Sequence, residues 1–250
     1  MKKILIPMMA VLAASTFSSP VLAASKDVTL DKFSKVKIFA PVDLDVSVGK
    51  KQSFSMEGRQ EDLDKLIIEV RNDTLVIKKE KRSDRMKKVM ISISMKELTQ
   101  FIINGSSDAK IRDVNTKSFE IGINGSGDVN FDGKSHDLDV EINGSGDVSS
   151  KSFDAKSVSA EINGSGDIDL AGKCDDLEVS ISGSGDFSGR ELLCSAVETR
   201  VSGSGDVTVY ARTSIRVRTS GSADVEVYGN PKSIQSRSSG SSELIVHENK

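Results

Sequence analysis

The sequence predicts an all-β fold, a parallel β-solenoid with roughly 19–20 residues in each coil. The first observation behind this prediction is a short phrase, in its full form Asn163-Gly164-Ser165-Gly166-Asp167, that recurs at spacings of 18 to 20 residues. A fixed period in this range marks a repeat architecture. The Gly-Ser pair that opens each copy begins at Gly105, Gly125, Gly144, Gly164, Gly183, Gly203, Gly221 and Gly240.

The second observation is the pattern of apolar residues around each of these glycines. Residues six, four and two places before the glycine are mostly apolar, as are those four and often six places after it, while the places between are mostly polar. This period of two describes strands whose apolar side chains all face one way. Coils of this kind bury their apolar side only by stacking on their neighbours, and a propeller blade would need about twice this length.

The third observation is the scarcity of large rings, since aromatic residues make up 4% of the chain and there is no Trp. A globular core this poor in rings would be unusual, whereas stacked coils filled with Val, Ile and Leu need few of them. Two or three strands per repeat, stacked about 4.8 Å apart, would form a rod. The prediction implies that Ile142, Ile162 and Ile181 lie in one column.

Residues 1–23 are typical of a secretory signal peptide. Lys2 and Lys3 precede an apolar run from Ile4 to about Phe17, and Val21-Leu22-Ala23 suits a signal peptidase. We expect the mature chain to begin at Ala24 and to be exported to the periplasm, the cell surface or the medium. No later apolar run is long enough to span a bilayer.

Residues 24–94 are predicted to form a β-rich N-terminal section that covers the solenoid. Alternating segments occur at 36–38, 44–48, 54–56, 66–70, 75–77 and 89–93, and residues 61–65 could form one helical turn. Residues 95–250 hold the repeats, and we expect 24–250 to be one continuous structural unit. Residues 78–88 carry seven basic and two acidic side chains; they form either a solvated loop or a contact for anionic surfaces such as lipopolysaccharide or acidic glycans.

The repeated turn makes separate demands on its residues. The first glycine is present in every copy, which indicates a positive φ or a close approach. The second becomes Ser107, Ala223 and Ser242 in three copies, so we expect this place to need only a small residue. Asn or Ser precedes the first glycine, and stacking predicts a ladder of amides and hydroxyls along this corner.

An acidic residue occupies the third place after the first glycine in every copy. Stacking would bring these like charges within about 5 Å of one another, which costs free energy unless something neutralises them. Either each carboxylate accepts hydrogen bonds within its turn, or the row holds a cation such as calcium, or it binds glycan hydroxyls. The residues of this candidate ligand or cation ridge are Asp128, Asp147, Asp167, Asp186 and Asp206.

The two cysteines occupy equivalent places, because Cys174 lies nine residues before Gly183 and Cys194 nine before Gly203. In an exported protein such a pair predicts a disulfide, and adjacent coils would bring the two Cα atoms within its range. Two free, packed thiols are the alternative.

The sequence gives no sign of a catalytic site. His136 and His247 are expected to be solvated surface residues, and no His or Cys cluster has the spacing of a metal site, so we expect no catalytic residue and no resident metal. The formal net charge is -3; without Lys2 and Lys3 it becomes -5, which argues against nucleic acid as a partner.

The segment Gly122-Ile123-Asn124-Gly125-Ser126-Gly127-Asp128 resembles the putative auto-transporter adhesin, head GIN domain family. The resemblance extends from about Phe33 to Val246 and includes 33–36 and 72–77. It implies a right-handed parallel β-solenoid at the envelope or outside a bacterial cell, with an adhesive role. The repeats run to within about four residues of the last residue, so we expect no translocator domain in this sequence.

Together these observations predict an exported, non-enzymatic, adhesin-like protein that binds an envelope or extracellular partner, glycan or protein. Two other functions stay open at this point. Paired carboxylates on a β-solenoid could cleave polysaccharide, and the chain could also be a purely structural envelope protein.

Overall fold

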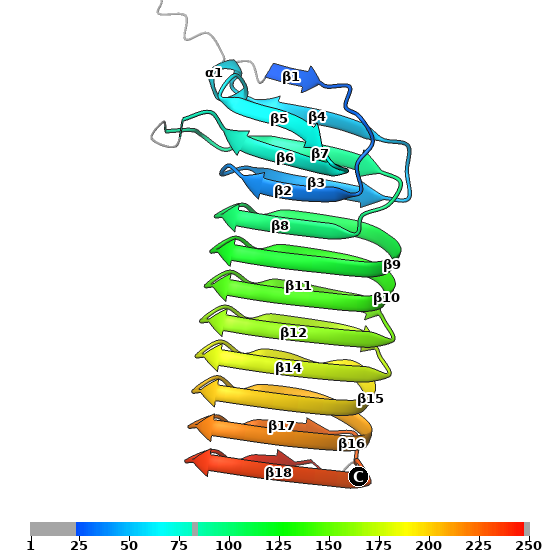
Figure 1. The fold of residues 1–250 in the computed structure, drawn as a ribbon, viewed down its shortest axis with the longest axis vertical. Helices are drawn as coiled ribbons and strands as arrows, with labels where there is room; N and C mark the ends of the chain where they lie inside the picture. The colour runs from blue at the N-terminus through cyan, green and yellow to red at the C-terminus, as the bar shows by residue number, and fades with distance from the viewer. Residues whose placement is uncertain (1–23, 82–84, 248–250) are drawn as a thin grey trace, which may run out of the picture.

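The computed structural model describes residues 24–81 and 85–247, so the predicted signal peptide lies outside the described residues. The described chain is 70% strand and 2% helix. Figure 1 shows a right-handed parallel β-solenoid in which the chain descends coil by coil from the N-terminal end. The predicted fold class is confirmed.

The repeats begin at the strand before Gly105 and build two faces. A long-strand face ends at each repeated glycine, and a short-strand face begins just after each repeated acidic residue. Some strands continue from the short face into the next long face around one corner. The strands of this region are β8 (Gln100–Gly105), β9 (Ala109–Gly125), β10 (Val129–Gly144), β11 (Val148–Asp154), β12 (Ser157–Gly164), β13 (Ile168–Lys173), β14 (Asp176–Gly183), β15 (Phe187–Gly203), β16 (Val207–Gly221), β17 (Val225–Tyr228), β18 (Ser233–Gly240) and β19 (Leu244–Val246).

Equivalent residues of consecutive coils pair directly. Ile142 of β10 pairs with Ile162 of β12, which in turn pairs with Ile181 of β14, and all three side chains are buried. The predicted column is therefore confirmed. Within the core, the rings of Phe119, Phe131 and Phe153 pack with centroids 5.0 to 6.3 Å apart.

Among its described residues, the N-terminal section adds seven strands and one short helix. They are β1 (Ala24–Asp27), β2 (Lys35–Phe39), β3 (Asp43–Val48), β4 (Ser53–Gly58), α1 (Gln60–Leu63), β5 (Leu66–Arg71), β6 (Thr74–Lys79) and β7 (Met90–Met95). Strand β4 pairs antiparallel with β1 and β7, and β5 pairs antiparallel with β6. These antiparallel pairs interrupt the parallel stacking at this end of the rod.

The stacking order at this end differs from the chain order. Strand β2 lies in parallel between β6 and β8, and β3 lies between β7 and β9. Strands β2 and β3 therefore form a true coil of the solenoid, placed between two coils that come later in the chain (Figure 1). The repeat phrase does not reveal it, because Ala40-Pro41-Val42 stands where the other turns carry glycine.

Candidate functional site: the acidic column and its groove

The repeated turn depends on two glycines for two different reasons. The first glycine of every copy has a positive φ; at Gly164 it is 147°. A Cβ there would also lie 2.1 Å from the carbonyl oxygen of Gly144 in the preceding coil. The prediction for the first glycine is confirmed, since an L side chain would be both strained and obstructed.

The second glycine is more restricted than the sequence suggested. Its φ is outside the left-handed region, but a Cβ at Gly146 would lie 2.2 Å from the carbonyl oxygen of Gly127. At this place in the central coils, therefore, even a small side chain does not fit. The expectation that any small residue suffices is wrong there, because backbones of successive turns approach too closely.

The amide part of the predicted ladder is present in the first four repeats. The side-chain amide of Asn124 donates to Oδ1 of Asn104, that of Asn143 to Asn124 and that of Asn163 to Asn143, each across 3.2 Å. Each amide thus acts as donor to one coil and acceptor from the next. The ladder fixes the register of the corner that carries the acidic residues.

The acidic residues form a continuous column on the other side of the turn. The backbone N–H of each member donates to Oδ1 of the member in the preceding coil, across 2.8 to 3.2 Å, from Asp128 through Glu243. The acidic column consists of Asp43, Asp108, Asp128, Asp147, Asp167, Asp186, Asp206, Asp224 and Glu243. The five residues of the predicted ridge are consecutive members of it.

These hydrogen bonds explain how like charges can stack. All members from Asp108 to Glu243 are exposed, so water screens their repulsion. Each amide N–H also brings a positive partial charge to a carboxylate oxygen, which is a charge-assisted bond. The carboxylate of each turn is therefore held by the next coil rather than by its own turn.

Asp43 is a member that the sequence did not reveal. The backbone N–H of Leu44 donates to the carbonyl of Asp108, and Leu44 pairs with Ala109 in the register that the later coils share. The Lys88 ammonium forms an ion pair with the Asp43 carboxylate. The alternation that follows Asp43 was the available signal, but without a Gly-Ser pair the turn was not recognised.

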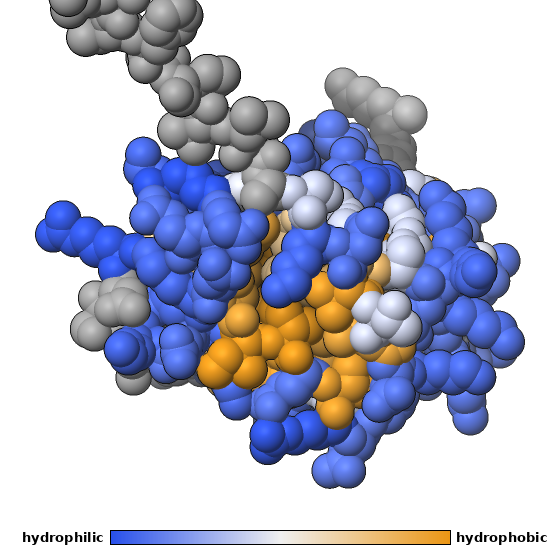
Figure 2. Space-filling model, turned by 90° about the horizontal axis from the view of Figure 1, so that it is seen from above, coloured by the Kyte–Doolittle hydropathy of each residue, from blue (hydrophilic) through white to orange (hydrophobic). Residues whose placement is uncertain are grey.

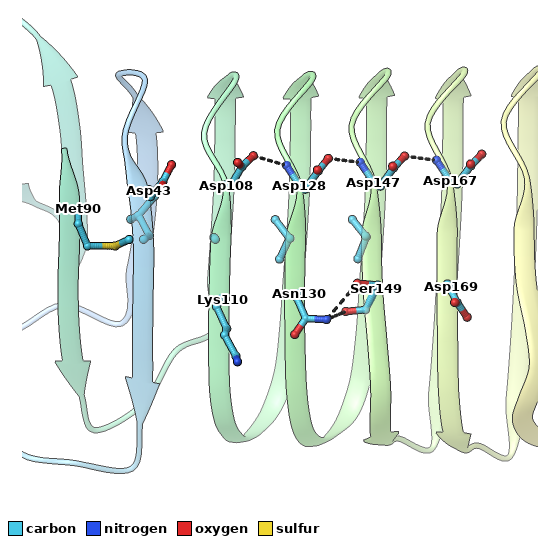
Figure 3. A pocket seen from close by; sticks show the side chains of 14 residues that line it. Asp43, Met90, Asp108, Lys110, Asp128, Asn130, Asp147, Ser149, Asp167 and Asp169 are labelled. Atoms are coloured by element: carbon cyan, nitrogen blue, oxygen red, sulfur yellow. Dashed lines mark hydrogen bonds between the residues drawn. The ribbon is translucent and has the colours of Figure 1, made fainter. Parts of the chain in front are cut away.

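A groove of about 600 Å³ runs beside the acidic column on the short-strand face. Figure 3 shows the column along one side and a second row of outward side chains along the other, in strands β7, β3, β9, β10, β11 and β13. The second row consists of Lys110, Asn130, Ser149 and Asp169. Asn130 donates from its amide to the hydroxyl of Ser149 across 3.0 Å. The groove thus offers carboxylates, an amide, a hydroxyl and one ammonium.

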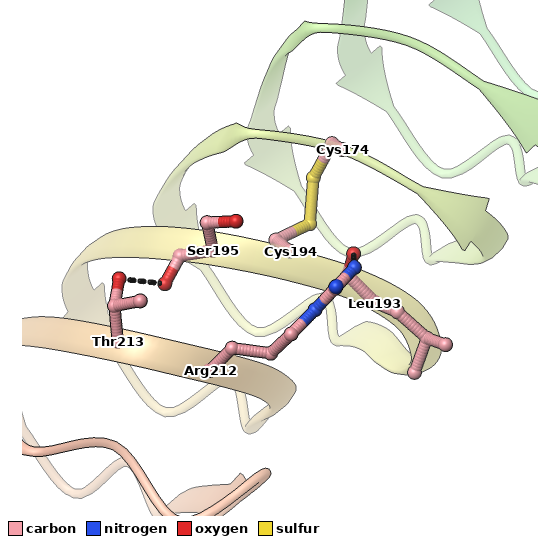
Figure 4. The surroundings of a disulfide bond; sticks show 6 residues. All are labelled: Cys174, Leu193, Cys194, Ser195, Arg212 and Thr213. Atoms are coloured by element: carbon pink, nitrogen blue, oxygen red, sulfur yellow. Dashed lines mark hydrogen bonds between the residues drawn. A yellow bond between two sulfur atoms is a disulfide. The ribbon is translucent and has the colours of Figure 1, made fainter.

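The structure joins Cys174 and Cys194 in a disulfide between successive coils, with their Cα atoms 4.4 Å apart (Figure 4). Both cysteines are buried. In the next coil, Thr213 donates from its hydroxyl to the carbonyl of Ser195, and Arg212 donates to that of Leu193. The corner opposite the repeated turn is therefore cross-linked covalently and by side chains.

The long-strand face carries an ion network that the sequence analysis missed. Glu198 accepts ion pairs from Arg200, Arg216 and Arg218. Burial alone would raise the pKa of Glu198, but the hydrogen bond from Arg218 and the positive charges around it lower that pKa below its usual value. Only the stacking of two coils, through the pairing of β15 with β16, brings these residues together, so spacing in the sequence gave little signal.

The two histidines occupy different surroundings. His136 is exposed and lies 2.8 Å from the carboxylate of Asp137. His247 is half-buried, stacks on the ring of Tyr228 with centroids 4.3 Å apart, and lies 3.0 Å from the carboxylate of Glu226. His247 thus packs on the last coil while 39% of its side chain stays exposed.

Within residues 24–81 and 85–247, no group of three or more His, Cys, Asp or Glu side chains is arranged to hold a metal ion. In the same residues, no helix has the length and apolar character needed to cross a bilayer. Residues 82–84 of the basic segment 78–88 lie outside the described chain. What the groove can do chemically is accept and donate hydrogen bonds along a line.

Solved structures of similar fold include three from Parabacteroides species. A putative lipid binding protein from Parabacteroides distasonis is 22% identical, with a TM-score of 0.83 over 90% of this chain and 97% of its own. A putative adhesin from the same species is 19% identical, with a TM-score of 0.84 over 91% and 98%. A putative adhesin from Parabacteroides merdae is 15% identical, with a TM-score of 0.82 over 90% and 96%. At these identities the likeness shows the fold.

The family comparison reaches further than the fold. No curated protein matches the chain. One family matches it twice, over residues 32–152 and 124–231, so the two matches together run through most of the β-solenoid. On this basis the chain belongs to the putative auto-transporter adhesin, head GIN domain family.

Proposed function

We propose that this chain is an exported, non-enzymatic, adhesin-like protein that binds a glycan chain along the groove beside the acidic column. The observation that carries the proposal is the pair of outward rows in Figure 3, which present one polar side chain on each side of an open groove in four successive coils. Sugar hydroxyls both donate and accept hydrogen bonds, so a line of carboxylates, amides and hydroxyls matches their chemistry.

The periodicity of the groove favours binding over catalysis. Asp108, Asp128, Asp147 and Asp167 hold equivalent places and make equivalent hydrogen bonds to the next coil. Glycoside hydrolysis instead needs two carboxyl groups in distinct environments, one acid and one base or nucleophile. An active site therefore requires a break in the symmetry of the coils, and the four carboxylates from Asp108 to Asp167 keep that symmetry.

Export is supported by two features of the chain. The first 23 residues are typical of a signal peptide, and a disulfide such as Cys174–Cys194 persists in oxidising compartments. Membership of an adhesin family is consistent with a place at the cell surface or outside the cell.

A glycan array tests the proposal. We expect retention of one glycan class by the wild-type chain, and at least about tenfold weaker binding when Asp128 and Asp147 are both changed to Asn. The matched control changes Asp206 and Asp224 to Asn, because these members of the same column lie outside the groove. Since Asn keeps an oxygen acceptor for the next N–H, neither pair should unfold the coil.

The outcomes separate the rival functions. Release of shortened glycan products, abolished by one carboxylate substitution, would replace binding with polysaccharide cleavage. Neither binding nor turnover would leave a purely structural envelope protein. Equal loss of binding in both double variants would show that net charge, rather than the groove, attracts the glycan.

Calcium along Asp128, Asp147, Asp167, Asp186 and Asp206 stays a hypothesis with its own test. Calcium takes about six to eight oxygen ligands, whereas one carboxylate oxygen of each Asp already accepts an N–H. We therefore expect calorimetry with calcium chloride to show no heat and no rise in melting temperature. A saturable heat that the Asp-to-Asn variants abolish would establish the cation ridge.

A further inference from the structure

The N-terminal end of the rod exposes an apolar surface. Figure 2, which views the molecule from this end, shows hydrophobic residues gathered in a central hollow and surrounded by hydrophilic ones. At this end six apolar side chains are only partly buried and pack against the core. These residues, the apolar mouth, are Val28, Leu30, Leu66, Ile68, Val70 and Met86.

The apolar mouth exists because the core ends here without a full cover. Among the described residues, strand β5 pairs only with β6, and β1 pairs only with β4. Helix α1 buries Leu63, but it is only four residues long. Contiguous apolar surface inside a polar rim is a mark of an interaction site.

Basic residues lie against this end of the rod. Lys81, Arg85 and Lys87 are exposed, and Arg85 and Lys87 flank Met86 of the apolar mouth. The Lys65 ammonium donates to the carbonyl of Arg85 across 3.0 Å, which ties this segment to the start of β5. Arg85 is therefore part of the rim of the apolar mouth.

Positive charge is concentrated in the N-terminal part of the chain, which forms the same end of the rod. Residues 24–100 contain seventeen Lys and Arg against thirteen Asp and Glu, a net charge of +4, while residues 101–250 contain fifteen against twenty-four, a net charge of -9. A positive end that also carries apolar surface matches a negatively charged lipid surface, which offers both anionic headgroups and acyl chains. The acidic remainder of the rod is repelled by the same surface.

We propose that the N-terminal end docks on an anionic phospholipid surface, with the apolar mouth against the acyl region and the Lys81, Arg85 and Lys87 side chains among the headgroups. The long axis would then stand away from the membrane. The groove on the side of the rod stays accessible in this orientation, so the docking surface and the proposed glycan site are independent.

Vesicle sedimentation tests the charge half of this proposal. Purified chain from Ala24 onward should sediment with phosphatidylcholine vesicles containing 30% phosphatidylglycerol at low salt, and far less with pure phosphatidylcholine or at high salt. The variant Lys81→Glu, Arg85→Glu, Lys87→Glu should bind at least about tenfold more weakly. The control Lys117→Glu, Lys134→Glu, Lys151→Glu makes the same charge change on exposed residues of the solenoid and should bind within about threefold of wild type.

A single tryptophan tests the apolar half, because the chain has no Trp of its own. Met86→Trp should show a blue-shifted emission with anionic vesicles and quenching by brominated lipid. Ile234→Trp, at the opposite end of the rod, should show neither.

The proposal is overturned if anionic vesicles do not bind, if both reporters are quenched equally, or if the charge-reversal variant and its control lose binding alike. It is also overturned if the apolar mouth is instead the contact of a stable dimer that excludes vesicles, as light scattering would reveal.

Discussion

The backbone N–H of Asp167 donates to Oδ1 of Asp147 across 2.9 Å, one coil away. The same bond recurs along the acidic column. A carboxylate that could only repel its neighbours thus becomes an acceptor that links two coils. The column is both a structural seam and an exposed acidic row beside the groove.

Changing Asp147 separates the acceptor from the charge. Asp147→Ala removes the acceptor for the Asp167 N–H and should lower the free energy of unfolding by about 1 kcal/mol, since the site is exposed and water replaces the lost bond. Asp147→Asn keeps an oxygen acceptor and removes one like charge, so stability should be equal or slightly higher at low salt. Urea unfolding measures both. If Asp147→Asn lowered the free energy of unfolding as much as Asp147→Ala, the charge of the carboxylate, and not its role as an acceptor, would stabilise the seam.

The first glycine of the turn should tolerate no side chain. Gly164→Ala should cost about 3 kcal/mol or more, because its φ of 147° is unfavourable for alanine and its Cβ would meet the Gly144 carbonyl at 2.1 Å. Gly122→Ala is the matched control, since a Cβ there would lie 3.4 Å from Ile102, an ordinary contact. Thermal unfolding compares the two variants. Equal melting temperatures would contradict the close approach of the turns.

Removing the disulfide should weaken the rod without changing its fold. Cys174 and Cys194 are separated by 20 residues, and closing a loop of this size stabilises a protein by about 2 to 4 kcal/mol. Reduction, or the double substitution to Ser, should therefore lower the unfolding free energy by that amount while the circular dichroism spectrum keeps its β signature. Mass spectrometry under non-reducing conditions provides the control, and alkylation of both thiols in the native, unreduced protein would contradict the pairing.

Acid should weaken the ion network around Glu198. The arginine partners hold the pKa of Glu198 below its usual value of 4.5. The folded state therefore binds the proton less readily than the unfolded chain, so this stabilisation is present above pH 4.5 and is lost as the pH falls through the lowered value. Glu198→Gln should lose stability at neutral pH and show a shallower decline below pH 4.5. The free energy of unfolding is measured against pH for the wild type and for Glu198→Gln. If it declined equally in both below pH 4.5, the Glu198 carboxylate would not be the group whose protonation weakens the network.

The period of the sequence was sufficient for the repeats but not for the N-terminal end. Ile142, Ile162 and Ile181 stack as predicted because a period of 18 to 20 residues and an alternation of two determine both the coil and its inward face. The family resemblance is confirmed as well. The coil of β2 and β3 was missed because its insertion between later coils depends on pairing across 60 or more residues, for example Leu44 with Ala109.

The candidate site could be predicted from the repeat only in part, because contacts between coils depend on the three-dimensional stacking. The acidic column follows from the repeat, whereas the source of its hydrogen bonds does not, because the donor of each bond belongs to the next coil. The prediction for the second glycine of the turn was wrong in the central coils. The residues found at that position of the repeat do not show how closely the backbones of successive turns approach. The stacking of His247 on Tyr228 and the arginines around Glu198 depend on side-chain directions at the last coils.

The most direct test of the proposed function is the dependence of affinity on ligand length. Calorimetry would use oligosaccharides of increasing length from the glycan class that the array identifies. Because the groove repeats one pair of polar side chains per coil in the four coils of strands β9, β10, β11 and β13, each added sugar should tighten binding until the ligand spans the groove. The Asp128→Asn, Asp147→Asn variant should flatten this dependence. Equal affinity for the shortest and the longest ligands would contradict a periodic binding groove.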